Sequence, residues 1–522
     1  MNSLNRRTFL ALTGATLGGA LIGTRVFAQT TTATSPVTSS LPELPPVPMR
    51  RLSPNLVEAT ITALPTNTTV AGQKAQLWTY NGSIRGSVLR VREGDTVRLK
   101  FVNHLPEATN LHLHGLHVSP EVDNPLAEVA PGETVKLEFE IPKGSAGTYW
   151  FHPHMHGMVA KQMFAGLAGV IVVEGIPDTM PELREAEERV IVLRDLELVN
   201  GQPSEHTMMD WMNGKEGNLL LVNGAIKPRL NAKKPTLRLR LVNASNARYY
   251  RLKLEGHPLY LIATDGGFIE KPVRLEELLL APGERAEVLV RLEHEGTFKL
   301  LNLPYERGKM MMGGMSAGNN ASNGSRSMGS MGSMAGMGDS SNTSSSDGMA
   351  GMSGMMGSTK ANTVQPPQTL LSVVAPKKPK LMPLPTVLTS VPTLDISQAV
   401  TRHIVLTEKM MQLQFLLNGK AFDPKRVDIT ANLGDTEIWE LVNKSDMDHP
   451  FHLHTYPFQV LSRNGKPEPY RAWKDVVNLK KNDIVRIAIP MTDFVGTTVY
   501  HCHVLEHEDK GMMGMLEVKG RA

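Results

Sequence analysis

The sequence predicts an all-β protein built from three β-sandwich domains of one kind, and three observations support this prediction. Short segments of alternating polarity are separated by turn residues, as in Thr96 to Phe101 and Thr236 to Leu241. The chain of 522 residues is too long for a single core and has the length of about three domains. A pattern of polar turn, strand and Val-Asn pair occurs three times, ending at Asn103, Asn243 and Asn443.

Each copy of this repeat continues with a second turn, a strand and a Gly-Thr pair. These pairs begin at Gly147, Gly296 and Gly496. We therefore expect domains at residues 50–178, 179–305 and 376–522. Residues 306–375 are expected to form an insertion and linker, because residues 310–356 hold 12 of the 29 methionines amid Gly, Ser and Asn, without strand or helix periodicity.

The N-terminus has the features of an export signal. Arg6 and Arg7 precede a mildly apolar stretch, and Val26-Phe27-Ala28 offers a cleavage site, so residues 1–28 resemble a twin-arginine signal peptide. An ordinary secretory signal or a short membrane anchor is the alternative, although Gly and Thr interrupt the apolar run. Residues 29–49, rich in Thr, Ser and Pro, are expected to form an extended leader. We predict an exported, periplasmic or extracellular protein without stable membrane insertion.

Charge and cysteine content narrow the function further. Lys and Arg number 55 against 51 Asp and Glu, with no run of one sign, which argues against nucleic acid as a partner. Cys502 is the only cysteine, so the chain has no intrachain disulfide. An unpaired thiol in an exported protein is explained if it binds a metal.

The histidines follow the repeat in the outer domains. Nine and eleven residues past the asparagine of the repeat lie His112 and His114 in the first domain, Leu252 and Leu254 in the second, and His452 and His454 in the third. Five and seven residues past its glycine lie His152 and His154, then Leu301 and Leu303, then His501 and His503. One His-x-His pair is usually structural. Four pairs in matched registers predict that histidines of the first and third domains converge on metal ions.

The third domain adds a second set of ligand-type residues. These are His449, Cys502 and His507, followed by Met512. Two histidines, a thiolate and a distant thioether are the ligand set of a blue-copper electron-transfer site. Met513 is the alternative to Met512, and a core methionine is the non-functional interpretation of either residue.

The order His501-Cys502-His503 links the two sites. Side chains alternate along a strand, so Cys502 should face one site while His501 and His503 face the other. An electron accepted at the cysteine-bound copper then has a covalent path to the eight-histidine cluster. One copper plus a cluster of three stores the four electrons that reduce dioxygen to water.

These motifs resemble the multicopper oxidases, in the three-domain branch of bacterial laccases and cuprous oxidases. The resemblance rests on His112-Leu113-His114-Gly115, Trp150-Phe151-His152-Pro153-His154, His449-Pro450-Phe451-His452-Leu453-His454 and the segment from His501 to His507 with Met512. It covers essentially the whole mature chain and implies three cupredoxin-like Greek-key β-sandwich domains that hold four copper ions.

The resemblance also implies how the ligands are divided. The type 1 copper takes His449, Cys502, His507 and Met512, and the type 2 copper takes His112 and His452. The type 3 pair takes His114, His152, His154, His454, His501 and His503. Asp123 and Glu508 match acidic residues that supply protons near the cluster in similar enzymes, with a turn-forming and a solvated role as the alternatives. His117 and His156, two residues past ligand pairs, are candidates to orient the ligands.

The electron donor is left open between Cu(I) and phenols or aromatic amines. Thioethers bind Cu(I), so Met447 with Asp446 or Asp448, joined by Met410 and Met411, is a candidate site for a substrate copper ion. The Met-rich insertion would collect Cu(I), although similar enzymes usually carry histidines in such segments and this one has none; a glycine-rich linker is the alternative. A third hypothesis is a copper-sequestering resistance protein without catalysis. We expect a monomer, since the copper sites are complete within one chain.

Overall fold

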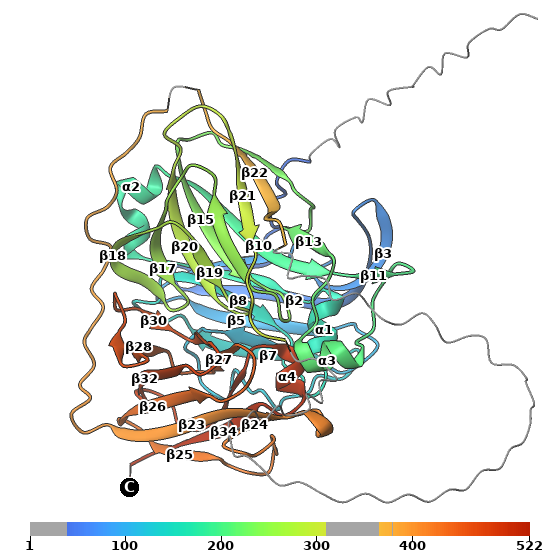
Figure 1. Ribbon diagram of the computed structural model, residues 1–522, viewed down its shortest axis with the longest axis vertical. Coiled ribbons are helices and arrows are strands. Elements are labelled where there is room, and N and C mark those ends of the chain that lie inside the picture. Colours follow the sequence, from blue (N-terminus) through green and yellow to red (C-terminus); the bar gives the residue numbers. More distant parts are fainter. Residues whose placement is uncertain (1–38, 310–364, 378, 522) are drawn as a thin grey trace, which may run out of the picture. The chain divides into compact units, whose positions relative to one another are not determined.

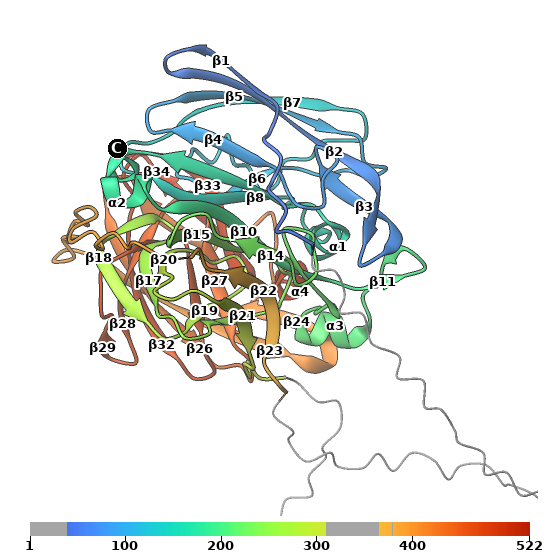
Figure 2. The same ribbon diagram turned by 90° about the horizontal axis from the view of Figure 1, so that it is seen from above.

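The structure is a computed structural model that describes residues 39–309, 365–377 and 379–521, without the side chain of Met410. The predicted signal peptide at 1–28 and the Met-rich segment at 310–356 therefore lie outside the described residues. Within the described part, three pairs of β-sheets follow one another along the chain, and the predicted all-β fold is confirmed (Figures 1 and 2).

The first domain pairs a sheet of five strands with a sheet of four. The larger sheet contains β1 (Met49–Ser53), β2 (Leu56–Val70), β3 (Gln73–Tyr80), β5 (Thr96–Asn103) and β7 (Thr134–Glu140). The smaller sheet has the order β4 (Val88–Arg92), β9 (Gly169–Glu174), β8 (Gly147–His152) and β6 (His112–His114). Apolar side chains from both sheets form one core between them.

The second domain repeats this arrangement with a sheet of six strands and a sheet of five. The first sheet has the order β13 (Leu219–Val222), β10 (Glu187–Leu196), β15 (Thr236–Asn243), β20 (Arg285–Arg291), β17 (Leu259–Thr264) and β18 (Gly267–Leu275). The second has the order β14 (Arg229–Asn231), β22 (Gln368–Val374), β21 (Thr297–Leu303), β16 (Tyr250–Leu254) and β19 (Leu278–Leu280). A separate two-stranded ribbon joins β11 (Leu198–Val199) to β12 (Gln202–Pro203).

Strand β22 differs from the sequence prediction, which placed residues 306–375 in an insertion and linker. Gln368–Val374 pairs antiparallel with β21 and so completes a sheet of the second domain. The reason is the apolar content of this segment, since Leu370, Leu371 and Val373 are buried in the core of that domain.

The third domain has a sheet of seven strands against a sheet of five. The first contains β24 (Gln414–Leu417), β23 (Val400–Lys409), β26 (Thr436–Asn443), β32 (Ile484–Pro490), β28 (Phe458–Arg463), β29 (Lys466–Pro467) and β30 (Trp473–Lys474). The second has the order β25 (Ile429–Asn432), β34 (Met513–Lys519), β33 (Gly496–Cys502), β27 (His449–Leu453) and β31 (Val476–Leu479).

Helices within the described residues are few and short. They are α1 (Val159–Ala165), α2 (Pro181–Arg184), α3 (Met208–Asn213) and α4 (Leu505–Asp509), with 3₁₀ turns η1 (Ile176–Thr179) and η2 (Met410–Gln412). In the described part of the chain, none is long and apolar enough to span a membrane. Helix α4 packs against both α1 and α3, which brings the three domains together near the end of β33.

The asparagine of the sequence repeat has the same structural role in each domain. Asn103, Asn243 and Asn443 end β5, β15 and β26, and all three side chains are fully buried. Each Oδ1 accepts from the backbone N–H two residues on. Each Nδ2 donates to two backbone carbonyls further along the chain, one four or five residues on and one 26 to 37 residues on. Buried backbone groups at a strand end need partners, and the asparagine supplies them. This requirement explains why the repeat is visible in the sequence.

The predicted leader is partly integrated into the fold. From residue 39 onward it runs along two domains, where the N–H of Leu41 donates to the carbonyl of Arg229 and the N–H of Val47 to that of Val88. Val47 is buried in the core of the first domain. The Pro-rich composition leads to an extended backbone, and such a backbone can still pair at the edge of a sheet.

Candidate metal centres

Two antiparallel strand pairs bring the eight histidines of the repeat together. In the first domain β6 places His112 opposite His152 of β8, and in the third domain β27 places His452 opposite His501 of β33. The two pairs meet across the domain boundary. Nε2 of His112 lies 3.3 Å from Nε2 of His452, and Nε2 of His154 lies 3.2 Å from Nε2 of His501. All eight imidazoles are buried.

Four of these rings are held by hydrogen bonds at Nδ1, which fixes the direction of Nε2. Nδ1 donates from His112 to Asp123 at 2.9 Å, from His152 to the Pro153 carbonyl at 2.9 Å, from His452 to the Asp475 carbonyl at 2.8 Å and from His501 to the Cys502 carbonyl at 3.0 Å. A ring that donates at Nδ1 keeps a lone pair on Nε2. The Nε2 atoms of these rings therefore point into the cluster with their lone pairs free to bind a cation.

This arrangement fits a cluster of copper ions. Burial lowers the pKa of His112, His114 and His152 well below the ordinary value, and neighbouring imidazoles lower it further. These rings are neutral, and Nε2 of His114 and His152 finds no hydrogen-bond partner in the described protein. Lone pairs that face each other in a buried space cost free energy, and metal cations relieve that cost. Imidazole nitrogens are ligands that suit copper.

The second predicted ligand set also comes together. Nδ1 of His449 lies 3.3 Å from Sγ of Cys502 and 3.3 Å from Nδ1 of His507, and Nδ1 of His507 lies 3.9 Å from the sulfur. All three side chains are fully buried. Burial raises the pKa of the Cys502 thiol and lowers that of His449 to about 3. A buried thiolate needs a cation beside it, so this set also fits a soft metal such as copper.

The two methionines after His507 lie in different cores. Met512 is buried in the same apolar cluster as Cys502, and its carbonyl accepts from the Cys502 N–H at 3.0 Å. Met513 begins β34 and packs instead with Val499 and Met515. Side chains alternate along the chain at this point, so the structure favours Met512 over Met513 as the partner of the cysteine.

The strand β33 carries the link between the sites. Sγ of Cys502 faces His449 and His507, whereas Nε2 of His501 lies 3.2 Å from Nε2 of His454 in the eight-histidine cluster. The two sites are thus joined through Cys502 and the cluster histidines directly before and after it, His501 and His503.

Both predicted acidic residues lie at the cluster. The two carboxylate oxygens of Asp123 lie 2.9 Å from Nδ1 of His112, and one lies 3.3 Å from Nδ1 of His454. Glu508 places one oxygen 3.1 Å from Nδ1 of His501 and the other 3.2 Å from Nε2 of His154. Burial by itself raises the pKa of Glu508, but the two histidines together outweigh it and the pKa is lowered. Glu508 is therefore ionised beside these two imidazoles.

The second domain supplies residues to the cluster that the sequence did not reveal. Arg285, fully buried, forms two hydrogen bonds to Asp475, at 2.7 and 2.6 Å, and its Nη1 lies 3.2 Å from Nδ1 of His114. The Cα of Gly283 lies against His503, so closely that a Cβ there would meet the ring at 2.8 Å. Gly283 belongs to the second turn of the repeat, but nothing in the sequence marks the contact of Gly283 or Arg285 with the cluster, because that contact depends on how the domains pack.

The residues predicted to bind a substrate copper ion are not brought to one exposed site. Met447 is fully buried in the core of the third domain. Asp448 accepts from the Tyr305 hydroxyl at 2.6 Å, whereas Asp446 is exposed and pairs with Lys481. Met411 is fully exposed on η2, and the side chain of Met410 lies outside the described residues. Of the three residues at 446–448, only Asp446 faces the solvent, and Met447 and Asp448 are both buried.

The two additional histidines do not contact a ligand imidazole in the described structure. His117 bonds through Nδ1 to the carbonyl of Thr455 and through Nε2 to Asp493. The ring of His156 packs on Phe422. His117 therefore ties the first domain to the third, and the orienting role belongs to Asp123 and Asp475.

Comparison with known proteins agrees with this geometry. Three family profiles described as multicopper oxidase match residues 62–178, 187–318 and 395–521. A multicopper oxidase of Staphylococcus haemolyticus is 31% identical over 448 residues, which is 84% of this chain and 83% of that protein. A cell division protein FtsP of Proteus mirabilis is 27% identical over 457 residues, covering 85% of this chain and 86% of the relative.

Solved structures give the same result. A multicopper oxidase of Campylobacter jejuni, described as a metallo-oxidase, superposes with a TM-score of 0.77 at 33% identity and covers 92% of this chain and 95% of that one. A laccase of Pediococcus acidilactici superposes with a TM-score of 0.75 at 28% identity, covering 92% and 94%. These structures confirm the three cupredoxin-like domains. With profiles on all three domains and a relative that matches most of its length, the chain belongs to the multicopper oxidase family.

Proposed function

We propose that this protein is an exported copper oxidase. It takes single electrons from Cu(I), phenols or aromatic amines at a type 1 site and uses four of them to reduce dioxygen to water at a trinuclear site. The observation that supports this most directly is the strand β33, on which Cys502 faces His449 and His507 while His501 faces the eight-histidine cluster.

The proposed division of the ligands is the one that the resemblance to multicopper oxidases implies. His449, Cys502, His507 and Met512 would hold the type 1 copper, and His112 and His452 the type 2 copper. His114, His152, His154, His454, His501 and His503 would hold the type 3 pair. When bound, the four coppers supply one-electron chemistry at one site and four-electron reduction of dioxygen at the other.

The protein's own residues carry the protons. Water formation from dioxygen consumes four protons, and a proton donor must lie within hydrogen-bond reach of the site. Asp123 and Glu508 contact opposite parts of the cluster, at His112 and His454 and at His154 and His501 respectively. We propose that these two carboxylates pass protons from solvent to the cluster while they hold the imidazoles in place.

The physiological donor is a separate question. The Met-rich composition of residues 310–356 favours Cu(I), and the described chain leads into that segment directly beside the type 1 site, since the carbonyl of Arg307 accepts from the N–H of Asp448. The burial of Met447 argues against the substrate site predicted at residues 446–448.

Oxygen uptake by fully copper-loaded protein tests the proposal, with Cu(I) and a methoxyphenol as sole donors, each with and without residues 310–356. Cu(I) turnover that collapses on deletion identifies a cuprous oxidase. Phenol turnover that survives deletion identifies a laccase. Lack of uptake with every donor would refute the oxidase and leave copper sequestration, which the complete set of cluster ligands argues against. The same experiment tests whether this chain is an oxidase at all, because the name of the related cell division protein FtsP states no reaction.

A further inference from the structure

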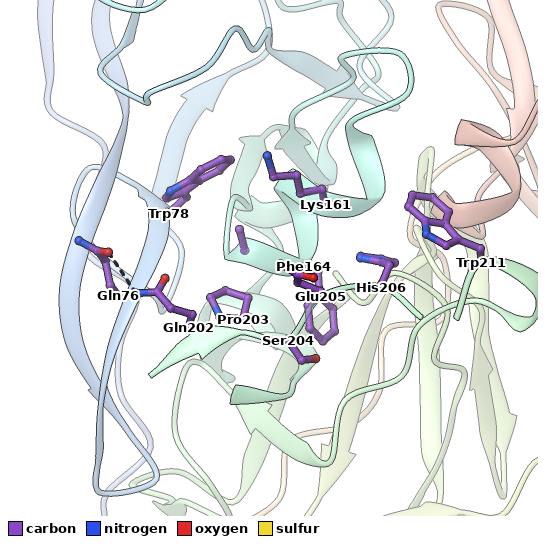
Figure 3. A pocket seen from close by; sticks show the side chains of 11 residues that line it. Gln76, Trp78, Lys161, Phe164, Gln202, Pro203, Ser204, Glu205, His206 and Trp211 are labelled. Carbon is purple, nitrogen blue, oxygen red and sulfur yellow. Dashed lines mark hydrogen bonds between the residues drawn. The ribbon is translucent and has the colours of Figure 1, made fainter. Parts of the chain in front are cut away.

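An aromatic cavity lies between the first and second domains, outside the predicted copper ligands. Its volume is about 570 Å³, which is the size of a site for a small aromatic molecule. Figure 3 shows Trp78 on one side, Trp211 on the other, and Phe164 and His206 between them. Gln76, Gln202 and Ser204 add polar groups to the lining, and Lys161 and Glu205 add charged ones. Nζ of Lys161 lies 5.2 Å from the centroid of the Trp78 ring.

Two short connections join this cavity to His507, the proposed type 1 ligand. Trp211 is followed in α3 by Met212, whose carbonyl accepts a hydrogen bond from Nε2 of His507 at 3.3 Å. His206 donates from Nε2 to Glu506 at 2.9 Å, and Glu506 directly precedes His507 in α4. The rings of His206 and Trp211 lie 4.8 Å apart, so both connections start from one wall of the cavity.

The pair of His206 and Glu506 has the arrangement of a proton acceptor. Glu506 is fully buried and its Oε1 also accepts from Nδ2 of Asn246 at 2.9 Å. Because Nε2 of His206 donates to this carboxylate, Nδ1 carries the lone pair. Within the described residues Nδ1 makes no hydrogen bond, so a donor in the cavity can use it.

The geometry points to this cavity as a binding site for phenolic electron donors, a proposal that rests on the proposed oxidase function. A phenol binds between the rings of Trp78 and Trp211, with its hydroxyl at Nδ1 of His206. The O–H bond breaks, the proton moves to His206, and one electron leaves through the Trp211–Met212 or Glu506 connection toward the type 1 ligands, where a bound copper(II) ion would accept it. The phenol becomes a phenoxyl radical, and dioxygen is the final electron acceptor.

Two variants of the copper-loaded, full-length protein test the site. His206→Phe keeps a ring in the wall and removes the proton acceptor. Gln202→Trp fills the cavity from an exposed position on β12. His403→Phe is the matched control, because His403 also pairs with a glutamate, Glu440, but on the exposed surface of the third domain.

Three probes separate binding, proton transfer and electron transfer. 2,6-Dimethoxyphenol gives an electron and a proton, ferrocyanide gives only an electron, and 1,2,3-trimethoxybenzene binds without a hydroxyl to lose. Binding of trimethoxybenzene is followed by quenching of tryptophan fluorescence, a measurement that needs no turnover.

For His206→Phe we expect the phenol kcat/KM to fall on the order of 100-fold, and the ratio of phenol turnover to ferrocyanide turnover to fall with it. Gln202→Trp should raise the phenol KM and the trimethoxybenzene Kd about tenfold, and it decides the question if His206→Phe does not fold. His403→Phe should change none of these.

Unchanged phenol kinetics in both variants, or trimethoxybenzene binding that Gln202→Trp leaves intact, would overturn the site. If the copper-loaded protein without substitutions does not oxidise ferrocyanide, the proposed oxidase function itself is refuted.

Discussion

Arg285 of the second domain reaches His114 of the first, with Nη1 of the guanidinium 3.2 Å from Nδ1 of the imidazole. The second domain has leucines where its neighbours have cluster histidines, and it nevertheless contributes to the cluster. Arg285 does so together with Asp475, whose carbonyl fixes His452. The domain without ligands thus connects the two domains that have them.

Replacing Arg285 should destabilise the protein strongly. Arg285→Gln leaves Asp475 as a buried carboxylate without its cation, which costs about 3 to 5 kcal/mol. The matched control is Arg50→Gln, since Arg50 and Glu58 form an exposed pair whose loss should cost less than about 1 kcal/mol. Urea unfolding of the copper-free proteins measures both changes. Equal effects in the two variants would show that the buried pair has no special structural role.

Removing the cysteine should separate the two copper sites. Cys502→Ser replaces the thiolate by a hydroxyl, which is a poor ligand for a soft metal. We expect the blue absorption to disappear, copper content to fall from about four to about three per chain, and oxidation of every donor to stop. Metal analysis with absorption spectroscopy checks this. Retention of four coppers and a blue colour would contradict the assignment of Cys502.

The two methionines provide a matched pair for the axial position. Met512→Leu removes a weak donor that stabilises the oxidised ion, so the reduction potential of the type 1 copper should rise. Met513→Leu should leave the potential unchanged, because Met513 packs with Val499 and Met515. Redox titration of the blue absorption compares the two variants. If the reduction potential shifted only in the Met513 variant, Met513 and not Met512 would be the axial ligand.

The sequence predicted which histidines lie close together because their spacing is locked to the repeat. Asn103 and Asn443 close equivalent turns, so counting from them finds His112 and His452 without knowledge of the packing. Residues that contact a ligand from another strand or domain have no fixed spacing from the repeat, so counting along the sequence does not find them. Asp475 acts on His452 through its backbone carbonyl, and any residue could supply that group.

The substrate residues could not be predicted in the same way. Met447 lies next to Asp446 in the sequence, yet one side chain is buried and the other is exposed. A cluster of suitable residue types does not reveal which of them face solvent. The strand β22 shows the same limit for the fold, since its sequence does not reveal that it pairs with β21 of the second domain.

Neutralising the acidic residues should slow oxygen reduction without changing the type 1 site. Asp123→Asn and Glu508→Gln keep the shape of the side chains and remove the proton carrier, so turnover should fall on the order of 100-fold while the blue absorption remains. Glu517→Gln, on β34 and half-exposed, is the control. Oxygen uptake measured across pH tests the effect, and a profile identical to that of the unaltered enzyme would exclude proton delivery by that residue.

The copper-free protein should lose stability as the pH falls. Burial lowers the pKa of His112, His114, His152, His452, His454 and His507 well below the ordinary value. The unfolded chain binds protons at these residues below about pH 6.5, whereas the folded chain does not. The stabilisation is therefore complete above that pH and is lost as the pH falls toward the folded values. Each histidine contributes a slope of about 1.4 kcal/mol per pH unit.

The second domain suggests the variant that isolates one histidine. His452→Leu introduces the residue that occupies the same register there, Leu252, and removes one titrating group. Between pH 7.5 and 5.5 the unfolding free energy of the variant should depend less on pH, by about 1.4 kcal/mol in total over that range. Urea unfolding at each pH measures this free energy. Copper-loaded protein should be more stable than copper-free protein at each pH, because copper binds the folded ligands preferentially. An unchanged slope in the variant would mean that His452 is protonated in the folded chain and is unavailable to a metal.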